Sequence, residues 1–276
     1  MTYIVFDTLK EYNDYTSNGT RLSSGVLYLV KENNGLFFLS NNFDGTLKVY
    51  EYFGGGGGGS ARVLESVELS SVTGATGLFK VNKYIETVTI PNGITEIWVG
   101  TFSGCTSLKN ITIPDSVISI GSSAFEGCTS LKNITIPDSV LGFGSSAFYN
   151  CTALTSINIP DGVTSISSTT FRGCSSLTSI TIPNTVTSID GSAFYKCSGL
   201  TSITIPASVT SIQWSVFQDC SALTSVTVEA ATPPTLGTNA FDNTNNCPIY
   251  VPAESVDAYK TATNWSSYAS RIQPIE

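Results

Sequence analysis

The residues of this chain that could do chemistry are mainly cysteines, and six of the seven recur at intervals of 23 residues. These six, called the ladder cysteines below, are Cys105, Cys128, Cys151, Cys174, Cys197 and Cys220. Because the chain has no histidine and no C-x-x-C pair, we expect no metal site and no cofactor. Cysteines on neighbouring turns of a coil would lie within the roughly 4.4–6.8 Å that a disulfide spans between Cα atoms, so pairing stays open. The interpretation we favour is a reduced thiol that fills a crowded bend of the core.

No other residues form a recognisable catalytic set. Catalysis needs a positioned acid, base or nucleophile, and the chain has neither histidine nor a G-x-S-x-G motif. Asp115, Asp138 and Asp161 each follow a proline, where aspartate commonly supports a turn through its own side chain. We therefore expect that the protein is not an enzyme.

Charge and hydropathy exclude two classes of partner. The formal charge is −8, and the 13 lysines and arginines are scattered rather than clustered, so we expect no nucleic-acid partner and no membrane-binding patch. No apolar run approaches 18 residues, and the first ten residues lack the basic start and apolar core of a signal peptide. Either the chain is not secreted by that route or it is a mature product, and Met1 favours the first alternative.

The elements that hold these cysteines follow from a second and a third column of repeated residues. Six prolines and six phenylalanines share the 23-residue period: Pro91, Pro114, Pro137, Pro160, Pro183 and Pro206, and Phe102, Phe125, Phe148, Phe171, Phe194 and Phe217. A fixed period of roughly 20–29 residues with L-x-x-L-x-L-like spacing is typical of leucine-rich repeats. Residues 61–276 are therefore predicted to form a leucine-rich-repeat solenoid, with a parallel β-sheet on one face and little helix.

One repeat shows how each coil should fold. Leu108, Ile111 and Ile113 are spaced to face the core from a short strand, which Pro114 ends because proline cannot donate to the ladder. Further apolar residues return to the core from the opposite wall and close the coil: Val117, Ile120, Ala124 and Phe125.

Residues 1–53 contain no repeat and eleven aromatic residues, which indicates a separate, small β-rich anchoring module. Alternating apolar runs and turn signals predict strands near 26–31, 36–40 and 46–52, and Thr8 to Tyr15 suits a short helix. Residues 54–60 are a glycine linker. Within the solenoid, we expect an N-terminal cap at 61–90 and a C-terminal cap at 229–276.

The residues that alternate with the buried isoleucines define the candidate binding site, called the polar face below. It consists of Asn110, Thr112, Asn133, Thr135, Ser156, Asn158, Ser179, Thr181, Ser202, Thr204, Ser225 and Thr227. A nearly uncharged surface of hydroxyls and amides could bind a glycan, or it could be a strand face filled by residues that favour β structure. Both interpretations stay open.

The repeats, written S-I-T-I-P-x-S-V-T-S-I-x-x-x-x-F-x-x-C-x-x-L, resemble the BspA-like leucine-rich-repeat family over residues 61–276. The tail IYVPA with SVDAYK and Asn264-Trp265 resembles the C-terminal end of such proteins. This resemblance implies a non-enzymatic adhesive or recognition surface, often extracellular. The front segment GVLYLV through NGLF, residues 25–37, resembles strand–turn–strand units of phage tail and fibre proteins.

Two functional hypotheses follow. The first is a bacteriophage fibre or decoration protein on the virion surface, held in the particle and in a homo-oligomer by residues 1–53, with the repeats binding a bacterial glycan or protein. The alternative is a BspA-like adhesin on a bacterial cell surface.

Overall fold

The computed structural model of the chain describes residues 80, 83, 86–90 and 92–276 in full and, nearer the N-terminus, the backbone of four strands. These strands are β1 (Tyr3–Phe6), β2 (Leu27–Glu32), β3 (Gly35–Asn41) and β4 (Leu47–Tyr50). β2, β3 and β4 pair antiparallel in sequence order, as the expected meander requires, and β1 adds a parallel strand beside β2. The expected helix at Thr8 to Tyr15, the linker 54–60 and most of the expected cap 61–90 lie outside the described residues.

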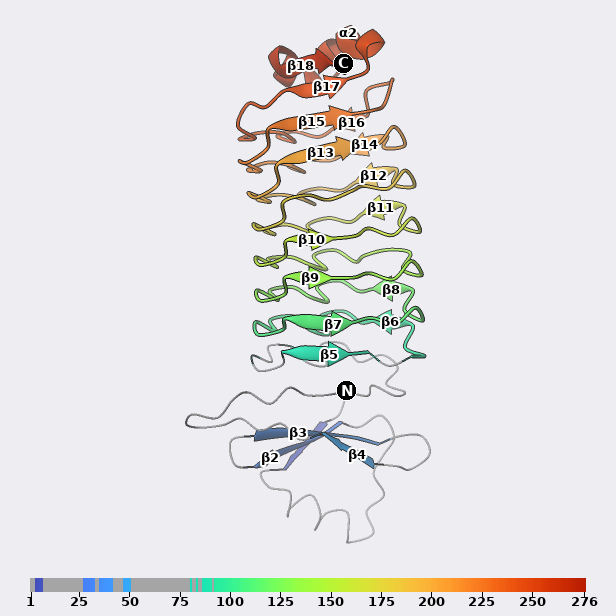
Figure 1. Ribbon diagram of the computed structural model, residues 1–276, viewed down its shortest axis with the longest axis vertical. Coiled ribbons are helices and arrows are strands. Elements are labelled where there is room, and N and C mark those ends of the chain that lie inside the picture. Colours follow the sequence, from blue (N-terminus) through green and yellow to red (C-terminus); the bar gives the residue numbers. More distant parts are fainter. Residues whose placement is uncertain are drawn as a thin grey trace.

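The repeats form a stack of parallel coils, and one side of the stack is the predicted parallel sheet (Figure 1). Residues 23 apart align across neighbouring coils, as Val88 with Ile111 and Ser202 with Ser225. The strands of this first ladder are β5 (Thr87–Thr89), β7 (Asn110–Thr112), β9 (Asn133–Ile134), β10 (Ser156–Ile157), β13 (Ser202–Ile205), β15 (Ser225–Val228), β17 (Ile249–Val251) and β18 (Ile272–Pro274). The ladder is interrupted twice: β7 and β9 belong to separate sheets, and the coil of Ser179–Thr181 has no strand there.

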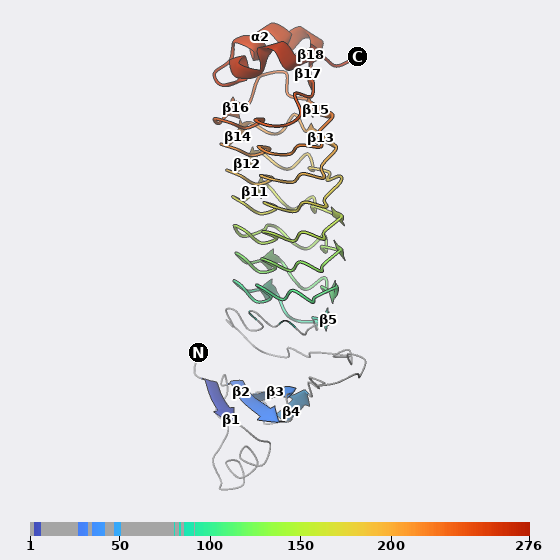
Figure 2. The same ribbon diagram turned by 90° about the vertical axis from the view of Figure 1, so that its left-hand side faces the viewer.

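A second ladder of two-residue strands lies on the opposite side of the stack (Figure 2). Its strands are β6 (Glu96–Ile97), β8 (Ser119–Ile120), β11 (Ser165–Ile166), β12 (Ser188–Ile189), β14 (Ser211–Ile212) and β16 (Thr235–Leu236). Ile120 is buried here, as predicted for the opposite wall. Strands at this position were not predicted from the sequence. The ladder narrows to a single bridge between Ile120 and Phe143, where a phenylalanine replaces the repeated isoleucine.

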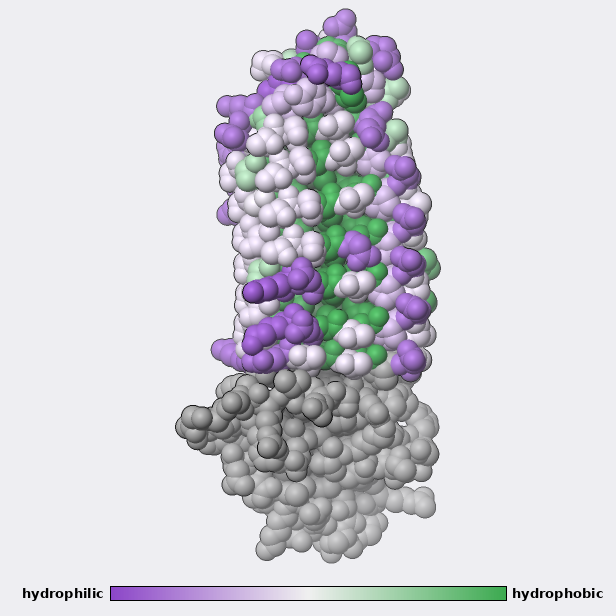
Figure 3. Space-filling model, in the orientation of Figure 1, coloured by the Kyte–Doolittle hydropathy of each residue, from purple (hydrophilic) through white to green (hydrophobic). Residues whose placement is uncertain are grey.

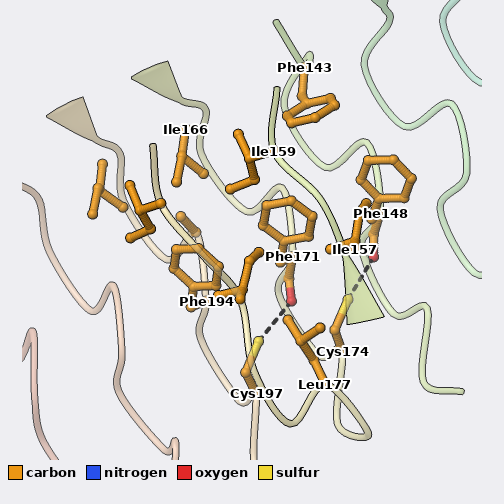
Figure 4. Close-up of a cluster of buried hydrophobic side chains, with 14 of the residues drawn as sticks. Phe143, Phe148, Ile157, Ile159, Ile166, Phe171, Cys174, Leu177, Phe194 and Cys197 are labelled. Atoms are coloured by element: carbon orange, nitrogen blue, oxygen red, sulfur yellow. Dashed lines mark hydrogen bonds between the residues drawn. The ribbon is translucent and has the colours of Figure 1, made fainter. Parts of the chain in front are cut away.

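The core is built from columns of identical side chains that stack along the axis (Figure 4). The phenylalanine column runs from Phe102 to Phe241 with ring centroids 5.3–5.6 Å apart and planes within 14° of parallel. The predicted inward positions of the repeat are confirmed for Leu108, Ile113, Val117 and Phe125, whereas Ile111 is only partly buried. Each coil therefore completes its core with residues of the coils on both sides.

Two kinds of turn close each coil. After the strand, the proline carbonyl accepts a bond from the backbone N–H three residues on, as Val117 N to Pro114 O at 3.0 Å, which confirms that the chain turns at proline. After the phenylalanine, one residue per coil adopts a left-handed backbone: Gly104, Gly127, Asn150, Gly173, Lys196, Asp219 and Asn243. Glycine and asparagine accept this conformation most readily, which accounts for their frequency in that column.

The C-terminal end of the stack is covered by short helices. The segment 229–276 first continues the stack with β16 and β17. Three short helices then follow: η1 (Ala253–Ser255), α2 (Val256–Thr261) and η2 (Trp265–Arg271). Trp265 is fully buried and continues the ring column, with its ring centroid 5.7 Å from that of Phe241. Its Nε1 donates to the Pro234 carbonyl at 2.8 Å. Tyr259 donates to the Ala230 carbonyl at 2.7 Å. The cap thus covers the Phe241 ring and donates hydrogen bonds to the backbone carbonyls of Ala230 and Pro234.

Candidate binding face

The polar face lies along the first ladder and points outward, as the sequence predicted. Ten of its twelve side chains are exposed, and Ser225 and Thr227 are half-buried. Successive strand residues point to opposite sides, so the neighbouring Ile203 and Ile205 are buried. Figure 3 shows pale residues of near-neutral hydropathy over β10, β13 and β15, with a green band of hydrophobic residues beside them along the stack. The polar face is therefore uniform in residue type, with serine, threonine and asparagine throughout, and it carries almost no charge.

Three of the twelve side chains bond to neighbouring coils. Asn133 Oδ1 accepts from Ser156 Oγ at 3.1 Å and from Thr155 Oγ1 at 3.0 Å. Asn158 bonds to both backbone groups of Ile136, at 2.9 Å to its N–H and 2.8 Å to its carbonyl. Within the described part of the chain, the other nine side chains of the face have no hydrogen-bond partner: Asn110, Thr112, Thr135, Ser179, Thr181, Ser202, Thr204, Ser225 and Thr227. These nine are the groups available to a ligand.

The threonine column beside the polar face serves the fold instead. Hydroxyls of Thr155, Thr201 and Thr224 donate to carbonyls of the preceding coil at 3.0–3.2 Å. Thr187 and Thr210 do the same beside the second ladder, both at 3.2 Å. Their role could have been suspected from the 23-residue spacing of threonine alone. Much of the hydroxyl content of the sequence is therefore structural, and the candidate site is limited to the outward strand positions.

Charged groups lie at the margins of the polar face. Lys109 and Lys132 flank its N-terminal end, where Lys109 Nζ lies 3.0 Å from Glu86 Oε2 in an exposed ion pair. Asp115, Asp138 and Asp161 are exposed, and among the described residues their carboxylates have no hydrogen-bond partner. The expected turn bond from these aspartates is therefore not formed, because the proline carbonyl already closes that turn.

All seven cysteines are buried and face the core. Five ladder cysteines, from Cys128 to Cys220, donate from Sγ to a phenylalanine carbonyl in the preceding coil at 3.1–3.2 Å (Figure 4). Burial raises the pKa of the Cys151 and Cys197 thiols well above its usual range, and that of Cys174 to about 12. The sequence predicted their burial but missed their role as donors. Protonated and sheltered, these thiols are poor nucleophiles.

The described residues contain neither a cation site nor a membrane-spanning helix. Among them, no three or more histidine, cysteine, aspartate or glutamate side chains gather as a cation site would require. In the same part of the chain, no helix has the length and apolar character needed to span a membrane.

Comparison with known proteins identifies the repeats. The family model of the BspA type leucine rich repeat region matches residues 75–160 and 141–267, with six copies. The chain belongs to the BspA-type leucine-rich-repeat family. This confirms the family resemblance and the solenoid inferred from the sequence.

Two solved structures of leucine-rich-repeat proteins are similar to the chain. A leucine rich repeat protein from T. pallidum is 27% identical and matches with a TM-score of 0.53 over 68% of this chain and 87% of that chain. A leucine rich cell surface protein from Faecalibacterium prausnitzii is 28% identical, with a TM-score of 0.35 over 55% of this chain and 62% of that chain. No curated protein sequence matches the chain. None of these matches is a phage protein, so the virion hypothesis stays a prediction and the alternative, a surface adhesin, is the better supported of the two.

Proposed function

We propose that this BspA-type solenoid is a non-enzymatic adhesion protein of a bacterial cell surface that binds glycans through the polar face. The observation that carries the proposal is the set of nine unpartnered hydroxyl and amide side chains on the first ladder. Membership of the BspA-type family supports the surface role, since resemblance to that family implies an adhesive surface.

The geometry of the face suits an extended, hydroxyl-rich ligand. Neighbouring strands lie about 4.8 Å apart, so a chain running along the axis meets an equivalent pair of polar residues on each coil. The backbone ladder fixes these positions before binding, which lowers the ordering cost. The hydrophobic band beside the hydroxyls offers contact to the C–H faces of sugar rings.

Isosteric removal of hydroxyls tests the proposal. A Thr181→Val, Thr204→Val variant keeps the β-branched shape of both side chains, and Thr164→Val is a control at an exposed threonine beside the second ladder. Loss of two neutral hydrogen bonds at about 0.5–1.5 kcal/mol each should weaken binding to an immobilised neutral oligosaccharide about 5- to 150-fold. The control should bind like the parent chain. Equal binding by all three proteins to every neutral oligosaccharide in a broad panel would overturn the role of this face.

We further propose that residues 1–53 attach the solenoid to a larger assembly, through an oligomer of the same module. Their eleven aromatic residues support this, because aromatic side chains are enriched in the buried cores of interfaces. A truncated chain starting at Ala61 should be monomeric and folded in sedimentation experiments, whereas the full chain should oligomerise. A monomeric full chain would refute the proposal for residues 1–53 without affecting that for the polar face.

A further inference from the structure

Three residues of one column form a stack of rings and guanidinium outside the polar face. Tyr149, Arg172 and Tyr195 are each 23 residues apart and therefore occupy the same position of consecutive coils. The Arg172 Cζ atom lies 5.6 Å from the Tyr149 ring centroid and 4.7 Å from that of Tyr195. Both distances are within the range of a cation–π contact, so the guanidinium is held between two rings. All three side chains are half-buried.

The backbone fixes the spacing of this stack. The carbonyls of Tyr149, Arg172 and Tyr195 each accept a bond from the preceding coil, at 2.7, 2.8 and 2.8 Å. The spacing of the three residues along the stack is thus set by the backbone of the coils rather than by a ligand. A pre-formed site of this kind loses little conformational entropy when a partner binds.

The donors of the stack have no partner among the residues that the structure describes. In the described part of the chain, the Arg172 guanidinium and the hydroxyls of Tyr149 and Tyr195 make no hydrogen bond. The ion pair of that part joins Lys109 and Glu86 and does not involve Arg172. Glu126 precedes Tyr149 in the same column, but it forms no ion pair with Arg172. With its Cζ atom over two tyrosine rings, Arg172 still has N–H donors to offer, and the fork that they form matches a planar carboxylate in a bidentate contact.

The local charge is also unusual for this chain. Between residues 133 and 259 the only cations are Arg172 and Lys196, in a protein of formal charge −8. Lys196 is exposed, and its Nζ lies 5.3 Å from the same Tyr195 ring that Arg172 contacts at 4.7 Å. Two positive charges therefore converge on one ring in a long stretch that otherwise has none, and they would attract an anion.

We propose that the Tyr149–Arg172–Tyr195 stack binds the acidic group of a charged sugar, at a second site separate from the polar face. The Arg172 edge would hold a carboxylate or sulfate oxygen pair, with the two tyrosine hydroxyls as additional donors and Lys196 as a second charge. A sugar fits better than a protein partner, because protein interfaces have an apolar core. The exposed large hydrophobic residues of the described chain, Val99, Ile118, Leu141, Trp214 and Ile275, occupy other columns.

Binding of defined oligosaccharides by the full chain tests this site. The probes are an oligouronate, its carboxyl-reduced neutral counterpart and a sulfated oligosaccharide, measured by calorimetry at low salt. Arg172→Gln should weaken oligouronate binding at least tenfold, and Arg172→Lys should restore it only in part, since lysine lacks the planar fork. Tyr149→Phe with Tyr195→Phe keeps the rings, removes the hydroxyls and should cause a smaller loss.

Controls separate this site from the polar face. Lys132→Gln removes a cation at the margin of the polar face and should leave oligouronate binding within about twofold, and Arg172→Gln should not change binding of a neutral oligosaccharide. Preference for the oligouronate or for the sulfated probe decides which acidic group is bound. Equal binding of the acidic and carboxyl-reduced sugars, no loss with Arg172→Gln, or tighter binding of an acidic peptide would overturn the proposal. A circular dichroism melt of each variant checks that the fold is retained.

Discussion

Truncation of Phe125 to alanine tests the stacked core most directly. The Phe125 side chain is fully buried, with ring centroids 5.4 Å from Phe102 and 5.3 Å from Phe148. Truncation of a buried phenylalanine to alanine generally lowers the free energy of unfolding by about 3–5 kcal/mol, because apolar burial is lost and a cavity is left. Here two stacking contacts are lost together, each worth about 0.5–1.5 kcal/mol beyond the buried area.

The coils on either side of Phe125 cannot close the resulting cavity. The Phe125 N–H donates to the Ala147 carbonyl at 2.8 Å, and the Phe102 N–H donates to the Ala124 carbonyl at 2.8 Å. These bonds hold the coils at a fixed spacing, so little relaxation can recover the lost contacts. We therefore expect Phe125→Ala to lower the free energy of unfolding by about 4–5 kcal/mol, the upper part of the usual range.

Urea unfolding followed by far-ultraviolet circular dichroism measures this loss, and Thr135→Ala is the matched control. Thr135 is an exposed residue of the coil that follows Phe125, so its truncation should cost less than about 1 kcal/mol. Because repeat stability is shared between neighbouring coils, hydrogen exchange should show lost protection first in the coils of Phe102 and Phe148. Similar losses for the two variants would refute the assignment of inward and outward positions.

Other predictions concern the turns, the pH dependence and the thiols. A Cβ on Gly144 would collide with the backbone nitrogen of Ser122, whereas one on Gly142 would meet nothing within 4 Å. Thermal melts should therefore show a loss of about 1–3 kcal/mol for Gly144→Ala and almost none for Gly142→Ala, and equal melts of the two variants contradict this. Burial raises the pKa of Cys174 from 9.0 to about 12 and that of Tyr268 from 10.0 to about 12. Because the folded state holds both protons more tightly than the unfolded state, this contribution to stability is complete below pH 9. The free energy of unfolding should therefore fall as the pH rises from about 9 to 12. Urea melts across this range check the sign, and a flat profile counts against it. The ladder cysteines should be alkylated, without prior reduction, only after unfolding; mass spectrometry that recovered cross-linked peptides from adjacent coils would show disulfides instead.

The period of the sequence was sufficient to predict the coil, its first sheet and its core. Phe102, Cys128 and Leu131 belong to columns that repeat every 23 residues, and such columns can be buried only by stacking. The outward direction of the polar face followed from strand alternation. The column of Tyr149, Arg172 and Tyr195 has the same period, but an arginine separates its two tyrosines and Glu126 precedes them, so no repeated residue type marks the column in the sequence.

Features that depend on contacts between coils could not be predicted. The second ladder consists of two-residue strands such as Ser119–Ile120, which are too short to show alternation. The thiol bond of Cys128 joins it to Phe102, 26 residues earlier, and neither residue type signals such a bond. β1 pairs with a strand more than twenty residues later, and its four residues contain no turn signal.

The in-register stacking of the coils determines how this protein can change in length over evolution. Duplication or loss of one 23-residue unit would leave every column aligned, lengthen or shorten the stack by about 4.8 Å, and add or remove one outward pair on the polar face. Insertions of other lengths must be absorbed in turns: Val228 pairs in the 23-residue register, whereas Thr235 aligns 24 residues after Ser211, so the extra residue lies between them. Tandem gene duplication can therefore extend the reach of such a protein from its anchoring point without any new packing solution.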